Sequence, residues 1–136
     1  MTLPNIPDHV AQRLSDEQVI WLTTVDSKRT PIATPVWFLW HDDAFLIFSK
    51  PGQAKLRNIA VSPNVSLHLN SSPSGGDVVV FVSEARTDDT GPTDAEWAAY
   101  ASKYVDSIPG IGLTPEGFRE SYSTTLRASP LRLRNW

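Results

Sequence analysis

The sequence predicts a mainly β, α+β fold: a small barrel of about six strands with three to four short helices at its periphery. Segments rich in β-branched and aromatic residues recur along the chain, some with alternating polar and apolar positions. Short turns separate the first three of these segments, which is typical of antiparallel hairpins. Between the others lie short stretches with helical spacing, which predicts small helices around the barrel.

The first half of the chain is predicted to form a helix at 10–18 and strands at 19–25, 31–40 and 44–49. Both faces of the second strand are largely apolar, with Ile32, Thr34, Val36, Phe38 and Trp40 on one and Ala33, Pro35, Trp37 and Leu39 on the other. We therefore expect this strand to be covered on both sides, by the barrel core and by a partner or ligand outside it. Pro35 lacks a ladder donor, which predicts an edge, a bulge or a gap facing a ligand.

The second half is predicted to add strands at 65–70, 77–86 and 123–136, and helices at 53–60, after Thr93 and after Thr114. Thr93 and Glu96 have the spacing of a capping box. Trp97, Tyr100 and Tyr104 then follow at helical spacing, which favours core side chains over a substrate pocket lining. Since there is no internal repeat or linker, residues 1–136 are expected to form one domain.

Composition excludes several classes of function. The chain has 136 residues, no cysteine and a formal net charge of −3. It therefore lacks disulfides, thiolate metal sites and a cysteine nucleophile, and the acidic balance argues against nucleic-acid binding. No apolar run is long enough for a membrane helix and the first residues lack a signal layout, so we expect a cytoplasmic protein without membrane contact.

No set of catalytic side chains is apparent. His9, His41 and His68 lack metal-ligand spacing, and the sequence has no nucleophile elbow, phosphate-binding loop or dinucleotide fingerprint. We therefore predict no metal site and no catalytic residues of the chain's own. If the protein is an enzyme, a bound cofactor carries the chemistry.

The clearest candidate site is the segment 49–58, SKPGQAKLRN. A strand ends at Ser49, a Pro-Gly turn follows, and a helix starts beside Lys50, Lys55 and Arg57. Free N–H groups at a helix start and nearby cations favour a phosphate. Thr34, Pro35, Val36 and Trp37 could provide a flat apolar surface for a heterocycle. A second group of cations lies in the last twenty residues, and six acids lie within 84–106. Because an acidic chain concentrates its cations in two places, we expect each group of cations to bind a small anion, with solvated surface charge as the alternative.

The segments WLTTVDSKRTPIATPVWFLW and FLIFSKPGQAKLRNIAVSPNVSLHL resemble the pyridoxamine 5′-phosphate oxidase-like family of flavin-binding proteins. The resemblance covers 19–70 strongly and extends to 129–136, but 87–122 carries little of it. It implies a six-stranded split β-barrel and a homodimer with two cofactor sites at the interface. It also implies redox chemistry through a flavin-type ring.

Within this family the sequence is most similar to the branch that uses the deazaflavin coenzyme F420. Members that use FMN tend to show Arg and Lys where this chain has Thr34 and Leu39. They also tend to show Ser-Arg-Lys where it has Gln53, Ala54 and Lys55. The run completed by Arg57 and Asn58 resembles the deazaflavin branch, which argues against pyridoxamine phosphate oxidase activity.

The resemblance thus implies an F420-dependent oxidoreductase that passes a hydride to an unsaturated or carbonyl-containing small molecule. Its expected cofactor contacts are Thr34, Pro35, Val36, Trp37, Ser49, Lys50, Lys55, Arg57 and Asn58. Arg132 and Arg134 share one strand face, and we expect one of them to pair across the dimer with an acid or the cofactor tail. Alternatives are an FMN-binding oxidoreductase of the same fold and a non-enzymatic protein that binds a cofactor or a tetrapyrrole.

Overall fold

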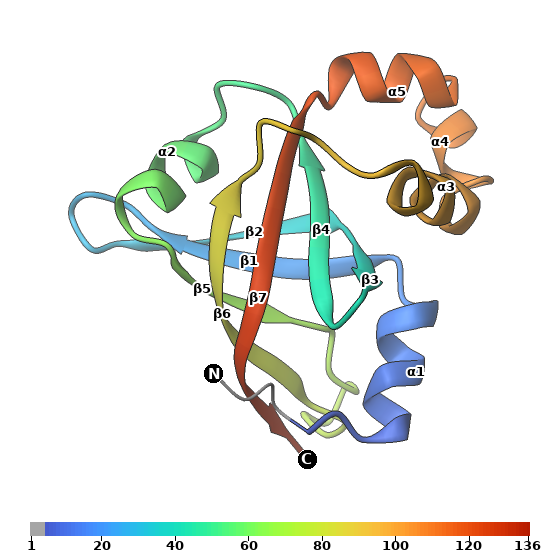
Figure 1. The fold of residues 1–136 in the computed structure, drawn as a ribbon. Coiled ribbons are helices and arrows are strands. Elements are labelled where there is room, and N and C mark those ends of the chain that lie inside the picture. Colours follow the sequence, from blue (N-terminus) through green and yellow to red (C-terminus); the bar gives the residue numbers. More distant parts are fainter. Residues whose placement is uncertain (1–4) are drawn as a thin grey trace.

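A computed structural model describes residues 5–136 as one curled antiparallel sheet of seven strands with five helices around it (Figure 1). The strands are β1 (Val19–Val25), β2 (Pro31–Trp37), β3 (Leu39–His41), β4 (Ala44–Ser49), β5 (Asn64–His68), β6 (Val79–Thr87) and β7 (Thr124–Asn135). The helices are α1 (Asp8–Asp16), α2 (Ala54–Val61), α3 (Asp94–Lys103), α4 (Ser107–Gly110) and α5 (Pro115–Ser121). None of these helices is both long and apolar enough to cross a membrane.

The sheet curls because its two edge strands are consecutive in the chain. The strand order is β2-β1-β5-β6-β7-β4-β3, and every neighbouring pair is antiparallel. One residue alone separates β2 from β3, so the edges of the sheet are brought together and a barrel results. The predicted fold class, a β-dominated barrel with short helices outside it, is confirmed.

Two hydrophobic clusters lie on the two faces of the sheet. The barrel interior holds the larger cluster, which includes Ile20, Leu22, Phe45, Leu67, Phe81 and Leu126. The smaller cluster joins the outer face of β3 and β4 to the helices α3, α4 and α5, and includes Leu46, Phe48, Tyr100, Tyr104 and Phe118. Figure 1 shows these three helices grouped on one side of the barrel. The helical lobe therefore packs outside the barrel and extends past the end of β4.

The single strand predicted for 31–40 is wrong, because it is interrupted at Phe38. The backbone N–H of Phe38 donates to the Tyr104 hydroxyl at 2.8 Å, and its carbonyl accepts from Tyr104 Oη and Lys103 Nζ, both at 2.9 Å. Side chains of α3 thus take the place of a neighbouring strand, which raises the strand count from six to seven. The predicted alternation survives: Val36, Phe38 and Trp40 pack with the barrel cluster, and Trp37 and Leu39 with the outer one.

Within one chain β2 is not covered on both sides, so its expected cover by a partner or ligand remains a prediction. Ile32 is 41% exposed, and Ala33 and Pro35 are also exposed. Since β2 is an edge strand paired only with β1, nothing in the described chain covers these side chains. Pro35 does lie at an edge, as its missing donor predicts.

Local capping explains the helices of the outer lobe. Thr93 and Glu96 form the predicted capping box, and the Thr114 side chain accepts from the Gly117 backbone N–H at the start of α5. The short helix α4 at Ser107–Gly110 is additional to the helices predicted from the sequence. Its formation follows from the buried Ile108, whose backbone N–H donates to the Tyr104 carbonyl and so continues the turn of α3.

Candidate functional site

The principal pocket has a volume of about 520 Å³ and opens where β4 ends between α2 and α5 (Figure 1). The barrel contributes one side, from β2 and the end of β4, and the helical lobe contributes the other. Its lining residues are Pro35, Val36, Trp37, Phe48, Ser49, Lys50, Gln53, Lys55, Tyr100, Ile111, Phe118 and Tyr122. The pocket thus combines an aromatic wall with two cations.

The aromatic wall is a contiguous set of packed rings. Trp37 stacks on Tyr104 with 4.6 Å between ring centroids, and it stacks on Phe118 at 5.8 Å. Phe118 in turn stacks on Tyr122 at 4.5 Å. The Tyr100 hydroxyl is buried without a hydrogen-bond partner, and burial, with Tyr104 and Tyr122 nearby, raises its pKa. This wall is flat, apolar and suited to a planar ligand.

A smaller pocket of about 110 Å³ adjoins the first. Its lining residues are Thr24, Ile32, Thr34, Gln53, Ala54, Lys55 and Asn58. Gln53 and Lys55 line both pockets, so the two are neighbours. Asn58 Nδ2 donates to Thr24 Oγ1 at 3.1 Å, and burial lowers the pKa of Lys55. Five of the seven residues that line the small pocket thus carry polar side chains, and one of them is the half-buried amine of Lys55.

The start of α2 adds backbone donors to this region. Gly52 has φ of 75°, a conformation that glycine adopts without strain and that completes the predicted Pro-Gly turn. The N-cap residue Gln53 makes no side-chain cap, and the first turn of α2 contains no acid. The N-terminal amides of α2 thus carry an uncompensated partial positive charge beside Lys55. Turn, helix start and amine together favour an anionic group.

All but one of the nine residues predicted from the first 58 positions line these two pockets. Thr34 and Asn58 line the small pocket, and Lys55 lines both pockets. The principal pocket is also lined by Pro35, Val36, Trp37, Ser49 and Lys50. The exception is Arg57, whose Nη1 donates to the Gly52 carbonyl at 2.8 Å. Arg57 therefore braces the turn before α2, and its guanidinium lies outside both linings.

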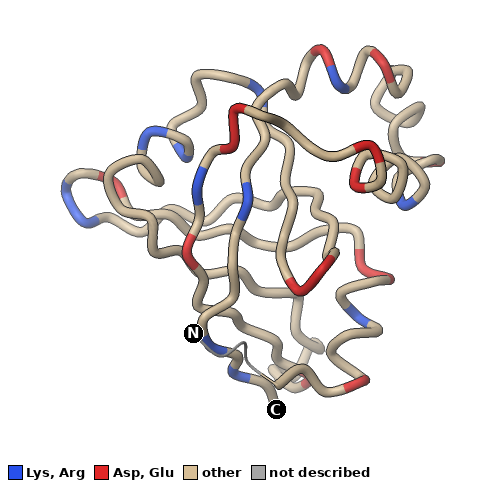
Figure 2. Tube along the Cα trace, in the orientation of Figure 1, with Lys and Arg blue, Asp and Glu red and all other residues tan. Residues whose placement is uncertain are grey.

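Arg132 and Arg134 do not approach the pockets of their own chain. They pair with Val82 and Val80 near the C-terminal end of β7, at the end of the barrel away from α2 (Figures 1 and 2). Both are exposed, and the Arg134 guanidinium lies 5.5 Å from the ring centroid of Trp136. Their predicted role across a dimer remains a prediction.

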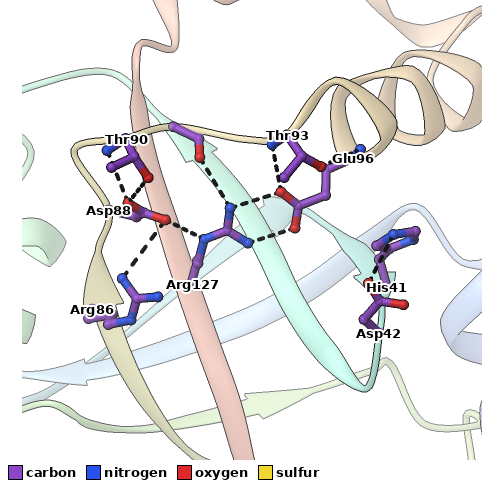
Figure 3. Close-up of polar contacts among 9 residues, drawn as sticks. His41, Asp42, Arg86, Asp88, Thr90, Thr93, Glu96 and Arg127 are labelled. Carbon is purple, nitrogen blue, oxygen red and sulfur yellow. Dashed lines mark hydrogen bonds and ion pairs between the residues drawn. The ribbon is translucent and has the colours of Figure 1, made fainter.

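The sequence missed an ion-pair network centred on Arg127 (Figure 3). Arg127 Nε donates to Asp88 at 2.6 Å, and its two terminal nitrogens donate to Glu96 at 2.7 and 2.8 Å. Hydrogen bonds from Thr90 and Arg127 lower the pKa of Asp88 to about 2, and Arg127 lowers that of Glu96 to about 2. Arg127 is therefore not free for a ligand, which corrects the expected anion binding for this one of the C-terminal cations. The sequence indicated this network only through the opposite charges of two segments, the acids within 84–106 and the cations of the last twenty residues.

Comparison with known proteins identifies the family. The pyridoxamine 5′-phosphate oxidase family model matches residues 6–136. The chain belongs to the pyridoxamine 5′-phosphate oxidase family. This confirms the resemblance read from the sequence. Comparison with curated proteins finds no match.

Solved structures of three proteins illustrate the range of this oxidase-like fold. An F420 reductase superposes with a TM-score of 0.73 at 18% identity, over 95% of this chain and 98% of that one. The haem storage protein HutZ from Vibrio cholerae superposes with a TM-score of 0.70 at 15% identity, over 96% of this chain and 95% of that one. A FAD-binding protein from Mesorhizobium loti superposes with a TM-score of 0.63 at 19% identity, over 90% of this chain and 88% of that one. At these identities the likeness shows the fold alone.

Proposed function

We propose that the protein is an oxidoreductase that binds coenzyme F420 and serves hydride transfer to an unsaturated or carbonyl-containing small molecule. The observation that carries the proposal is the pair of adjoining pockets. A broad aromatic pocket suits a planar ring, and a small pocket that shares Lys55 with it and carries the Thr34 and Gln53 side chains suits a phosphate. When bound, the deazaflavin ring supplies the hydride, and the chain supplies the site.

The donors present fit a phosphate. In the small pocket, the Lys55 amine, the Thr34 hydroxyl and the Gln53 amide line one space with the uncapped start of α2. No Asp or Glu lines either pocket, so nothing repels an anion there. Burial lowers the pKa of Lys55, and a bound phosphate would supply a negative charge that stabilises the protonated amine.

The remaining side chains would position the ligand and exclude water. Trp37 and Phe118 are held by their mutual stacking, so the wall they form is rigid before anything binds. Ser49 is 1% exposed and its hydroxyl donates to the Lys50 carbonyl, which fixes the turn at the mouth of the pocket. An apolar wall around a reacting ring strengthens the electrostatic contacts of the chain with it and keeps water away.

FMN is the runner-up cofactor, since the same pocket pair would accept its ring and single phosphate. A tetrapyrrole is the third candidate, because the fold is also that of a haem storage protein. Haem iron commonly needs an axial ligand such as histidine, and none of His9, His41 and His68 lines either described pocket. This observation favours a flavin-type cofactor over haem.

We further propose that the protein is a homodimer with its cofactor sites at the interface. The exposed outer side of β2 supports this, because Pro35 lines the principal pocket and is itself uncovered in one chain. A second copy placed against β2 would bury the apolar edge strand and narrow the mouth of the pocket at the same time.

The proposal is tested by titrating the purified full chain with F420 and with FMN while following fluorescence quenching, and by assaying reductase activity over a broad substrate panel. We expect F420 to bind more tightly than FMN and the loaded protein to reduce some members of the panel. Yellow FMN retained through purification would favour the runner-up. Haem binding, or cofactor binding without any reductase activity, would overturn the enzymatic proposal.

A further inference from the structure

Three accessible side chains, Lys50, Ile111 and Tyr122, line the principal pocket on the side of the helical lobe. Lys50 directly follows β4, Ile111 lies between α4 and α5, and Tyr122 is the C-cap of α5. In Figure 1 the end of β4 lies next to the point where α5 leads into β7. Tyr100 and Phe118, the other lining residues of the lobe, are buried and support this side from behind. A ligand on this side therefore meets the first three side chains.

Ile111 is an apolar side chain that the fold leaves uncovered at the pocket. It is 48% exposed, and its backbone N–H donates to the Ile108 carbonyl at 3.2 Å. The next N–H, of Gly112, donates to the Pro109 carbonyl at 2.9 Å, and Gly112 takes a φ of 80° that favours glycine. Hydrogen bonds thus close this turn and hold Ile111 at the pocket. Beside the Tyr122 ring, it offers apolar contact to a ligand.

Lys50 adds a cation to this apolar side. Its Nζ lies 5.5 Å from the ring centroid of Tyr122. Within residues 5–136, no carboxylate lies within ion-pair distance of this amine. Lys103 differs, because its Nζ donates to the carbonyls of Phe38 and Leu14. An ammonium has three donors, so Lys50 can bind an anionic group of a ligand while it stays beside the ring.

The two cations of the principal pocket have different neighbours. Lys55 also lines the small pocket, together with Thr34 and Asn58. Lys50 does not line the small pocket, and its aromatic contact is with Tyr122 at the end of α5. A phosphate in the small pocket would therefore neutralise Lys55 and leave Lys50 without a counter-charge. A second anionic group, on the side of the lobe, would complete the site.

We propose that the substrate is an apolar carboxylic acid, whose carboxylate binds Lys50 and whose apolar part contacts Ile111 and the ring of Tyr122. The inference rests on the proposed function, since it names the substrate class of that same site. No Asp or Glu lines the pocket, so a cationic substrate would find no counter-charge there. The carboxylates of a cofactor tail have the same chemistry, and the experiment separates these two sources.

The test titrates the full chain calorimetrically with cinnamate, an unsaturated apolar carboxylate, and with cinnamamide, its uncharged isostere. At low salt we expect cinnamate to bind about fivefold more tightly, which is the effect of one exposed ion pair. Added salt should reduce this preference, because it screens the pair. Lys50→Met should remove the preference, and Lys50→Arg should retain it. Ile111→Ser should weaken both compounds equally, and all three variants should keep the parent's melting temperature because both side chains are exposed.

Two controls locate the carboxylate. Lys55→Met should retain the preference for cinnamate, and Lys50→Met should leave F420 affinity close to that of the parent. The proposal is overturned if the parent binds both compounds equally, if the preference persists in Lys50→Met, or if Lys55→Met removes it. A large loss of F420 affinity in Lys50→Met with an unchanged preference would assign Lys50 to the cofactor tail.

The titrations are made on the chain without cofactor and repeated with F420 bound, so the two proposals can fail separately. A parent that does not bind F420 would lose the proposed function, whereas its preference for cinnamate would still report on Lys50. A parent that binds F420 and does not distinguish the two compounds would keep the proposed function and lose only the substrate class.

Discussion

Lys55 and Arg57 lie two residues apart on α2, but their charges have different surroundings. Lys55 lines both adjoining pockets and is half-buried, whereas Arg57 is exposed and donates to the Gly52 carbonyl. Sequence reasoning gives both residues the same role, since spacing on a helix does not show which side chain bends back onto the preceding turn. Arg57 therefore supports the turn, and we expect direct ligand contact from Lys55 alone.

This distinction predicts unequal effects on cofactor affinity. Lys55→Ala should weaken F420 binding about ten- to a hundredfold, because a charge-assisted contact of about 1.5–3 kcal/mol is lost. Arg57→Ala should have a smaller effect, through a looser turn at Gly52. Fluorescence titration at fixed ionic strength measures both, with Lys28→Ala as the control, since Lys28 is exposed in the β1–β2 turn and lines neither pocket. Normal folding and unchanged affinity in Lys55→Ala would mean that the phosphate binds elsewhere.

Two buried tyrosines, Tyr104 at the C-cap of α3 and Tyr100 within that helix, differ in whether their hydroxyls attach the helix to the barrel. Tyr104 Oη accepts from the Phe38 N–H and shares its single proton between the carbonyls of Gln18 and Phe38, which lie at 2.6 and 2.9 Å. Tyr100 Oη, one turn earlier, is buried without a partner. The first hydroxyl fastens α3 to the junction of β2 and β3, and the second contributes no hydrogen bond to the fold.

We therefore expect Tyr104→Phe to lower the free energy of unfolding by about 1–3 kcal/mol, because it leaves the Phe38 N–H without its partner, although the Phe38 carbonyl still accepts from Lys103. Tyr100→Phe, which removes a hydroxyl from an equally buried ring, should leave stability unchanged or raise it. Urea unfolding of both variants gives the comparison. Equal losses in the two would show that ring packing, and not the Phe38 hydrogen bonds, fastens α3.

The network around Arg127 fixes the segment between β6 and α3 onto β7, and its carboxylates predict acid sensitivity. Asp88 and Glu96 have pKa values near 2 in the folded protein, below those of the unfolded chain. The unfolded state therefore binds more protons as the pH falls. Their contribution to stability is complete above about pH 5 and is lost as the pH falls toward about 2.

Glu96→Gln should lower the free energy of unfolding by about 1 kcal/mol at neutral pH, a value that allows for solvent screening of a partly exposed pair. The difference from the parent should shrink as the pH falls toward about 2, where Glu96 itself is protonated. Urea unfolding at several pH values tests this, with the exposed Glu120→Gln as control. A difference that stays constant with pH would show that Glu96 acts through packing.

For the whole molecule, local patterns predicted the barrel well because hairpin turns and capping signals involve residues close in sequence. Asp42 and Asp43, for example, take positive φ values in the predicted turn between β3 and β4. Features set by contacts distant in sequence were missed. The break at Phe38 depends on residues of α3 more than 60 positions away, and the Arg127 network joins three segments. Most of the pocket lining on 34–58 was predicted, although Phe48, Gln53 and Ala54 were missed. The lining on α5 was also missed, because the sequence carries little family resemblance there.

The last prediction concerns assembly. Arg132 and Arg134 face outward beside Val80 and Val82 and make no ion pair among the described residues, so they are available to a second copy. Truncation would be a poor test, because Arg132–Asn135 pairs with Val79–Val82 and Leu133 packs against the barrel core. Substitution keeps the strand and removes only the charges.

The double variant Arg132→Gln/Arg134→Gln should therefore fold with the parent's melting temperature and dimerise at least about tenfold more weakly, since charge-assisted contacts across the interface are lost. Sedimentation velocity over a range of protein concentrations measures the dimer, and F420 titration shows whether the partner's arginines also hold the cofactor tail. The exposed Arg29→Gln, in the β1–β2 turn, controls for a change of surface charge. If dimerisation and cofactor affinity both match the parent, the arginines lie on a solvated strand edge, and the interface must be sought along β2.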